Sequence, residues 1–524
     1  MPDSTIPAIV DDSPATNITD VVTEYNYPVD TGFLQVYGPE NQSDAKDQAE
    51  SQALTAQARA HSPSLPDPDL QQSFADTYFE YCYTWCPVLD RDKLSRDMLQ
   101  SSMLINALAL VGSQIQPPLL PHDGPALYYD RAKRKFYEDE ETDVILSLKA
   151  VSLFYWWSPR PPTTVHRHSS WWWQSVIIRH CQHMGIHRSP VQDHPSRTES
   201  DYTVRRRIWW TAFARERLTA ICQSRPAIID PDDCDIAEPT LSDFPGLLPQ
   251  DTIKAEVFIY WVRLCSIIGK IAKRLSKTFD QPSSPFPDHL AKELIDWMNS
   301  LPAHLRLPIA LDRTTSYHRD VHQLHLPYLA VIIILHLKRC AQPVPEAYPP
   351  AIMAATCIAR ILKDILARGG TRYMMAISCW YTGTAFTALL QASRSDYLRS
   401  AASQDLEICT LAIDQLRKMW PTGNIMYSAF QRLRQQDNLQ GNHPLGLQSR
   451  GASNGAASFE TGIDWISYFP FASSQTSELA GKLLAERSHT AELFPEDAFA
   501  DATMYNFTDL LEPYDALAEM NLFM

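Results

Sequence analysis

A long helix is predicted by the stretch RRRIWWTAFARERLTAIC, residues 205–222. Apolar residues recur in it at helical spacing, behind a basic triplet and a pair of tryptophans. An Arg-Pro turn follows at Arg225 and Pro226, and then an acidic loop that contains Pro231 and Pro239. Proline removes a backbone donor and clashes with the preceding helical turn, so the helix must end before this loop.

The same helical period recurs on both sides of this stretch, and no internal repeat of fixed length accompanies it. Helices are predicted over residues 70–86, 103–111, 126–137, 144–157, 171–184, 252–279, 288–300, 314–339, 351–368, 373–392 and 403–419. Only 17 of the 524 residues are glycine, and scarce glycine disfavours the tight turns that hairpins require. The predicted fold class is all-α, with a large helical body.

The net charge of −15 is concentrated at the two ends of the chain. Residues 1–70 contain twelve acidic and two basic residues, and residues 488–524 contain eight acidic residues and no Lys or Arg, which leaves +3 for the residues between. An acidic chain is a poor partner for nucleic acid over its whole surface. Residues 1–70 lack periodicity and are predicted to be disordered. We therefore divide the chain into an acidic N-terminal region (1–70), a helical body (71–434), a linker rich in small and polar residues (435–487) and an acidic tail (488–524).

The tail interleaves its acidic residues with leucine, phenylalanine and tyrosine. This alternation is typical of activation segments, in which repelling charges keep apolar groups available to fold into a coactivator groove. A C-terminal helix docked on the body is the alternative interpretation, and the composition leaves both open.

Cysteine usage predicts a reducing compartment. The ten cysteines are dispersed, mostly within apolar helical windows, as buried free thiols are. Only Cys82 and Cys86 lie close together, and no second pair is near enough to complete a tetrahedral zinc site. The N-terminus lacks the apolar run of a signal peptide. The most apolar run, residues 329–335, is too short to cross a bilayer, so no membrane partner is predicted.

Two histidine sets have a spacing that can place imidazoles around one metal ion: His180, His183 and His187, and then His318, His322 and His325. Neither set has an acidic residue in the register of a metallohydrolase, so polar packing is the favoured interpretation. The chain also lacks a nucleophile elbow, a phosphate loop and a dinucleotide fingerprint. We therefore predict no catalytic residue, no cofactor and no metal.

Seven tryptophans gather within one part of the sequence: Trp156, Trp157, Trp171, Trp172, Trp173, Trp209 and Trp210. Large aromatic side chains usually anchor a core, and a ligand cavity that they line is the alternative. The arginine triplet at 205–207 is expected to be solvated or paired with acids rather than to bind nucleic acid. A basic cluster at 131–135 is a candidate nuclear import signal.

Three segments, taken in order, resemble the middle homology region of fungal zinc-cluster transcription factors, and within that family the cutinase transcription factor 1-like branch. The segments are Met184-Gly185-Ile186-His187-Arg188, then Arg205 to Trp210 with Arg225-Pro226 and the loop to Pro239, and then Leu324-His325-Leu326-Pro327-Tyr328 with Ile333 to His336. The resemblance implies an all-α regulatory domain, a nuclear location and control of transcription.

The six-cysteine zinc cluster of the family, which places a helix in the major groove, does not occur in this sequence. Two expectations follow: the chain acts without direct DNA binding, or the gene begins upstream of the first residue. The leading interpretation is a transcriptional regulator of a pathway-specific gene set, such as a secondary-metabolite cluster, that forms homo- or heterodimers and contacts coactivators through its tail. The alternatives are a coregulator that pairs with a complete zinc-cluster factor, and a helical ligand-binding protein or enzyme.

Overall fold

A computed structural model describes residues 65–162, 167–189, 199–223, 225–277, 288–338, 346–440 and 464–485. Helices dominate this part of the chain, which confirms the all-α prediction. Two residues in each of β1 (Leu337–Lys338) and β2 (Glu346–Ala347) pair antiparallel, with Leu337 opposite Ala347. The predicted acidic tail at 488–524 and nearly all of the predicted N-terminal region lie outside the described residues.

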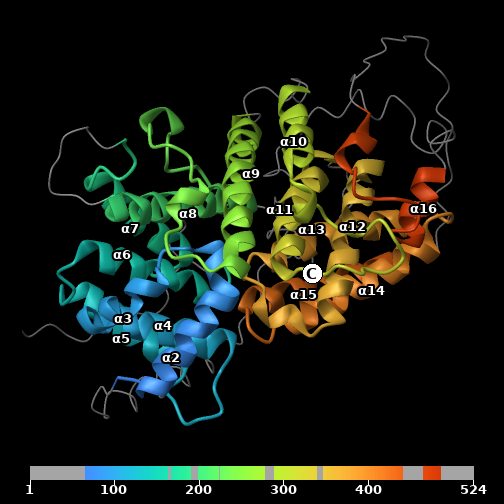
Figure 1. The fold of residues 1–524 in the computed structure, drawn as a ribbon. Helices are drawn as coiled ribbons and strands as arrows, with labels where there is room; N and C mark the ends of the chain where they lie inside the picture. Colours follow the sequence, from blue (N-terminus) through green and yellow to red (C-terminus); the bar gives the residue numbers. More distant parts are fainter. Residues whose placement is uncertain are drawn as a thin grey trace, which may run out of the picture.

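The first half of the fold is a group of helices drawn in blue to green (Figure 1). They are α2 (Pro68–Thr77), α3 (Arg91–Gln100), α4 (Ser102–Ile115), α5 (Pro125–Tyr137), α6 (Val144–Ser152), α7 (Ser170–His183) and α8 (Glu199–Gln223). A π turn at Tyr78–Cys82 extends α2, and a 3-10 turn at Leu153–Trp156 extends α6. Residues 205–222 form most of α8, which packs along α7 and α9.

The long helix α9 (Thr252–Lys277) separates this half from the second one (Figure 1). The remaining helices are α10 (Asp288–Ser300), α11 (Arg319–Leu335), α12 (Pro349–Leu366), α13 (Ser378–Ala392), α14 (Arg399–Leu416), α15 (Pro421–Gln440) and α16 (Glu478–Ala485). Helices α11, α12 and α13 are buried over almost their whole length. Burial of this extent is expected for the central helices of a large body.

Local signals explain where several helices begin and end. Ser169 caps α7 by accepting a hydrogen bond from the amide of Trp172. Gly185 ends the same helix in the left-handed conformation, φ +66°, and the amide of Ile186 then reaches the carbonyl of Cys181 at 2.8 Å. Glycine adopts this conformation without the steric cost that a side chain adds. The end of α7 at His183 therefore lies within one residue of the predicted end at residue 184.

Part of the predicted linker is wrong. Within residues 435–487, α15 continues to Gln440, and residues 464–485 pack against the second half of the fold. Phe469 and Phe471 are buried there, and the hydroxyl of Tyr328 donates to the carbonyl of Tyr468 at 2.9 Å. A few large aromatic side chains anchor this segment, although its small and polar residues resemble a linker.

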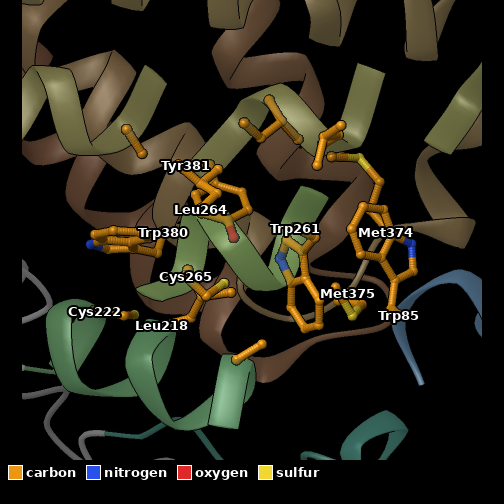
Figure 2. Packing of buried hydrophobic residues seen from close by; sticks show 14 of the residues in the cluster. Trp85, Leu218, Cys222, Trp261, Leu264, Cys265, Met374, Met375, Trp380 and Tyr381 are labelled. Atoms are coloured by element: carbon orange, nitrogen blue, oxygen red, sulfur yellow. The ribbon is translucent and has the colours of Figure 1, made fainter. Parts of the chain in front are cut away.

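Three side chains from different helices meet in the core between the two halves (Figure 2). Leu218 belongs to α8, Cys265 to α9 and Trp380 to α13, and all three are buried. The halves therefore share one continuous apolar core. None of the described helices combines the length and the apolar composition that a membrane span requires.

Candidate functional site

A cavity of about 620 Å³ lies beside this shared core. The start of α7 and the second half of α8 form one side of it, and Met375, Ala376, Ile377, Trp380 and Thr422 form the other. The cavity is therefore built by residues far apart in the sequence, at the place where the two halves meet. Its size falls within the range of small-molecule sites in proteins.

Arginine supplies all of the formal charge in the described lining. Arg160, Arg167, Arg215 and Arg225 border the cavity, and no Asp or Glu does. Arg160 and Arg167 are exposed, whereas Arg215 and Arg225 are more buried. The site is therefore electropositive from its exposed edge to its interior.

Arg215 occupies an aromatic environment with no carboxylate beside it in the described part of the chain. Its Cζ lies 4.7 Å from the centre of the Tyr155 ring and 5.3 Å from the centre of the Trp156 ring. Its Nε and Nη2 atoms are buried and have no hydrogen-bond partner among the residues that the structure describes. Burial lowers the pKa of this guanidinium from its ordinary value, but arginine keeps its charge even when buried.

Arg225 repeats this arrangement closer to the surface. Its Cζ lies 4.9 Å from the centre of the Trp171 ring, and its buried Nε has no hydrogen-bond partner in the described part of the chain. Burial lowers the pKa of Arg225 as well. Two neutral donors of the lining, Tyr155 Oη and Trp380 Nε1, are also buried and have no hydrogen-bond partner within the described ranges. Buried donors are normally satisfied, so such a group of unsatisfied donors is typical of a binding site.

Some tryptophans of the tryptophan-rich part of the sequence are core anchors and others line the cavity. Trp156, Trp173 and Trp209 are almost completely buried and act as core anchors. Trp171 and Trp172 border the cavity instead, and Trp172 is 40% exposed. The core interpretation is confirmed for the first three residues, and the cavity interpretation describes the other two.

The sequence did not predict that Arg215 and Trp380 border a cavity. Arg215 lies three and seven residues before Leu218 and Cys222, on the same face of α8. A charge in an otherwise apolar helical register is a signal that could have pointed to it. Trp380 carries no such signal, because its place at the cavity depends on the packing of α13 against α8 and α9.

Two arginines of the triplet, Arg206 and Arg207, are paired with acids, which is one of the two predicted states. Arg206 Nη1 lies 2.6 Å from Asp243 Oδ1. Arg207 is fully buried, with Nη2 2.5 Å from Asp90 Oδ1 and Nη1 donating to the carbonyl of Pro87 at 2.7 Å. These pairs attach α8 to two loops of the first half, so Arg206 and Arg207 are structural.

The candidate import signal lies on α5 and at its end, where its cations also have acidic partners. Arg131 pairs with Asp123, Lys133 with Asp130 and Lys135 with Glu140. A role of this cluster in nuclear import stays a prediction.

The cysteine pair and the second histidine set serve packing, whereas His180 and His183 of the first set are exposed. Cys82 and Cys86 are buried free thiols, and burial raises the pKa of Cys86 to about 12. His318 caps α11, and the Nδ1 atoms of His322 and His325 each lie 2.8 Å from the carbonyl oxygen four residues earlier.

Burial lowers the pKa of His325 to about 4, so this histidine is neutral at physiological pH. In the first set, the turn at Gly185 takes His187 off the α7 face, where its ring lies 5.7 Å from that of Trp209. No group of three potential metal ligands occurs among the described residues.

The profile of one protein family matches the part of the chain that builds the first half and α9. It is described as the fungal specific transcription factor domain, and it matches residues 75–305. The match covers a little under half of the chain. The arginines of the cavity lie within the matched segment, whereas Met375, Trp380 and Thr422 lie beyond its end.

Curated relatives extend the similarity to about 70% of the chain. It is 26% identical over 405 residues to cutinase transcription factor 1 alpha of Fusarium vanettenii, which covers 43% of that protein. It is 25% identical over 399 residues to the acetamidase regulatory protein of Aspergillus oryzae, which covers 48% of it. Transcription factor cpaR of Aspergillus oryzae is 22% identical over 341 residues, which cover 55% of this chain and 56% of that protein.

The chain thus spans just under half the length of the first two relatives. No solved structure matches it. The matched domain and these relatives are described as transcription regulators and not as enzymes.

Proposed function

We propose that this chain is a nuclear regulator that controls a pathway-specific set of genes in a fungus, such as a secondary-metabolite biosynthetic cluster. The observation that carries the proposal is the fungal specific transcription factor domain at residues 75–305. The names of two relatives each refer to one enzyme, cutinase or acetamidase, which supports control of a narrow gene set. The choice of secondary metabolism comes from the family resemblance of the sequence.

Transcript profiling of a deletion strain tests this proposal. We expect a small group of genes, adjacent in the genome, to change expression and to recover when the intact gene is restored. Unchanged transcripts, or changes spread over unrelated genes, would contradict control of one pathway. A fluorescent fusion that stays outside the nucleus would contradict the proposed location.

In this proposal the chain works as a homodimer or as a heterodimer, and its acidic tail at 488–524 recruits transcription coactivators. The tail is tested by tethering the chain to a promoter through an unrelated DNA-binding domain. We expect deletion of residues 488–524 to lower reporter output, and replacement of the tail aromatics by alanine to lower it as well. Reporter output that survives both changes would place activation elsewhere in the chain.

The mode of promoter contact takes one of two forms. The chain binds DNA directly, or it reaches DNA as a coregulator bound to a complete zinc-cluster factor. Chromatin immunoprecipitation locates the promoters, and a mobility-shift assay with the purified chain then separates the two forms. A shift with the chain alone supports direct binding, and a shift that requires a co-purified zinc-cluster protein supports the coregulator.

A further inference from the structure

The cavity between the two halves has the chemistry of a binding site for an anion. We propose that it binds a small organic anion, in which a carboxylate or a similar acidic group is attached to a flat apolar body. This inference deepens the proposed function, because it names the class of effector that the regulatory body would sense.

The charge of the described lining selects for an acidic group. Four arginines border the cavity without any Asp or Glu, and Arg215 and Arg225 have no ion-pair partner among the described residues. An unpaired charge is costly in a poorly solvated site, so an anionic ligand would relieve that cost. Guanidinium groups match the geometry of carboxylates because their parallel N–H bonds can donate to both oxygens.

The first turn of α7 adds to this preference. Ser169, Ser170, Trp171 and Trp172 border the cavity at the N-terminus of a 14-residue helix. Backbone amides at that end carry partial positive charge, which favours a negatively charged ligand group nearby. The buried, unsatisfied nitrogens of Arg215 provide the independent sign that the site accepts a ligand.

The rest of the lining selects for a flat apolar body. Trp171 and Trp172 belong to α7 in the first half, whereas Met375 and Trp380 belong to the second half, just before and within α13. Aromatic side chains around a cavity offer flat faces and large apolar area to a ring system. A ligand held there would contact both halves at once, α7 and α8 on one side and the start of α13 on the other. Binding would therefore stabilise one arrangement of the two halves.

Two fluorescent dyes test the proposal because they share a ring system and differ in charge. The probe is 8-anilinonaphthalene-1-sulfonate, an anion, and the matched neutral dye is N-phenyl-1-naphthylamine. Each is titrated against the purified full chain while its fluorescence is measured. We expect the anionic dye to bind more tightly than the neutral one.

The decisive variant is Arg225→Gln, because Arg225 is only partly buried and its loss should leave the fold intact. A hydrogen bond to a charged group contributes about 1.5–3 kcal/mol, so affinity for the anionic dye should fall at least about tenfold. Affinity for the neutral dye should change less than about threefold. Arg215→Gln should have the same selective effect, provided that its circular dichroism matches the parent.

Arg263→Gln is the matched control. Arg263 also lies over an aromatic ring, with its Cζ 5.2 Å from the centre of Tyr260, but it is outside the cavity lining. This variant should leave both affinities unchanged. Ala376→Trp fills the cavity, so it should weaken both dyes.

Three results would overturn the proposal: equal binding of the two dyes by the parent, equal effects of Arg225→Gln and Arg263→Gln, or anionic-dye binding that survives Ala376→Trp. Dye binding needs no promoter, and transcript profiling needs no ligand. The two proposals can therefore fail separately.

Discussion

Replacement of Arg207 by methionine is expected to destabilise the whole body, because Arg207 forms a fully buried ion pair. Both side chains are at most 1% exposed, and Nη2 lies 2.5 Å from Asp90 Oδ1. Among the described residues, Arg207→Met leaves Asp90 with only the ion pair to Lys93, at 3.4 Å, and it removes the donor from the carbonyl of Pro87. Breaking a buried pair in this way typically costs about 3–5 kcal/mol.

The free-energy loss converts into a shift of the melting temperature. Unfolding entropy is about 2.1 cal/mol/K per residue, which gives about 0.8 kcal/mol/K for a folded body of roughly 370 residues. A loss of about 3–5 kcal/mol then lowers Tm by about 4–6 °C. Thermal unfolding followed by circular dichroism measures this shift.

A double variant separates the ion pair from the packing of the arginine stem. Asp90→Leu combined with Arg207→Met removes both buried charges, so it should cost clearly less than the two single variants together. The control Arg263→Gln breaks an exposed pair with Glu238, where both side chains are about half exposed. Such pairs contribute about 0–1 kcal/mol, so Tm should fall by about 1 °C or less. A Tm loss for Arg207→Met no larger than that of the control, or additive losses in the double variant, would refute the reasoning.

Three further perturbations follow from the packing. Burial raises the pKa of Asp405 to about 7, against the effect of a hydrogen bond from Thr356. The stabilising contribution of Asp405 is therefore complete near pH 4 and is lost as the pH rises through 7. Asp405→Asn should raise Tm at pH 8, with a gain in the free energy of unfolding of up to about 4 kcal/mol, and should raise it much less at pH 5; an equal gain at both pH values would contradict this. Gly269→Ala would place Cβ 2.3 Å from Cδ of Arg217, so the strain of overpacking should cost about 1–3 kcal/mol, whereas wild-type thermal stability would show that the arginine moves away. Phe471→Ala should cost about 3–5 kcal/mol and release residues 464–485 to limited proteolysis, and a segment that stays protected would show that other contacts hold it.

The described helices show which parts of the fold were predictable. Helices with a regular apolar face, such as α9 and α10, were found from sequence, because burial of one face requires that period. Helix α3 was missed because only Leu94 and Asp97 are buried along it. Asp97 is held by an ion pair with Lys149 of α6, 2.5 Å between Oδ2 and Nζ, and such a pair leaves no periodic signal.

The start of α11 shows a smaller error of the same kind. The periodic pattern placed it at residue 314, whereas the helix begins at Arg319 because the side chain of His318 caps it. Histidine is not among the usual capping residues, so the sequence gives little warning of this boundary.

The sequence by itself determined the helical class and the resemblance to a family of transcription regulators, because hydrophobic period and a short motif are local properties of the chain. Only the tertiary structure decided that residues 464–485 belong to the body and that Arg215, Arg225 and Trp380 border one cavity. Those residues are separated by up to 165 positions along the chain, and their proximity depends on how α8, α9 and α13 pack. Side-chain packing between distant helices follows from the shapes of all their neighbours, which no local pattern contains.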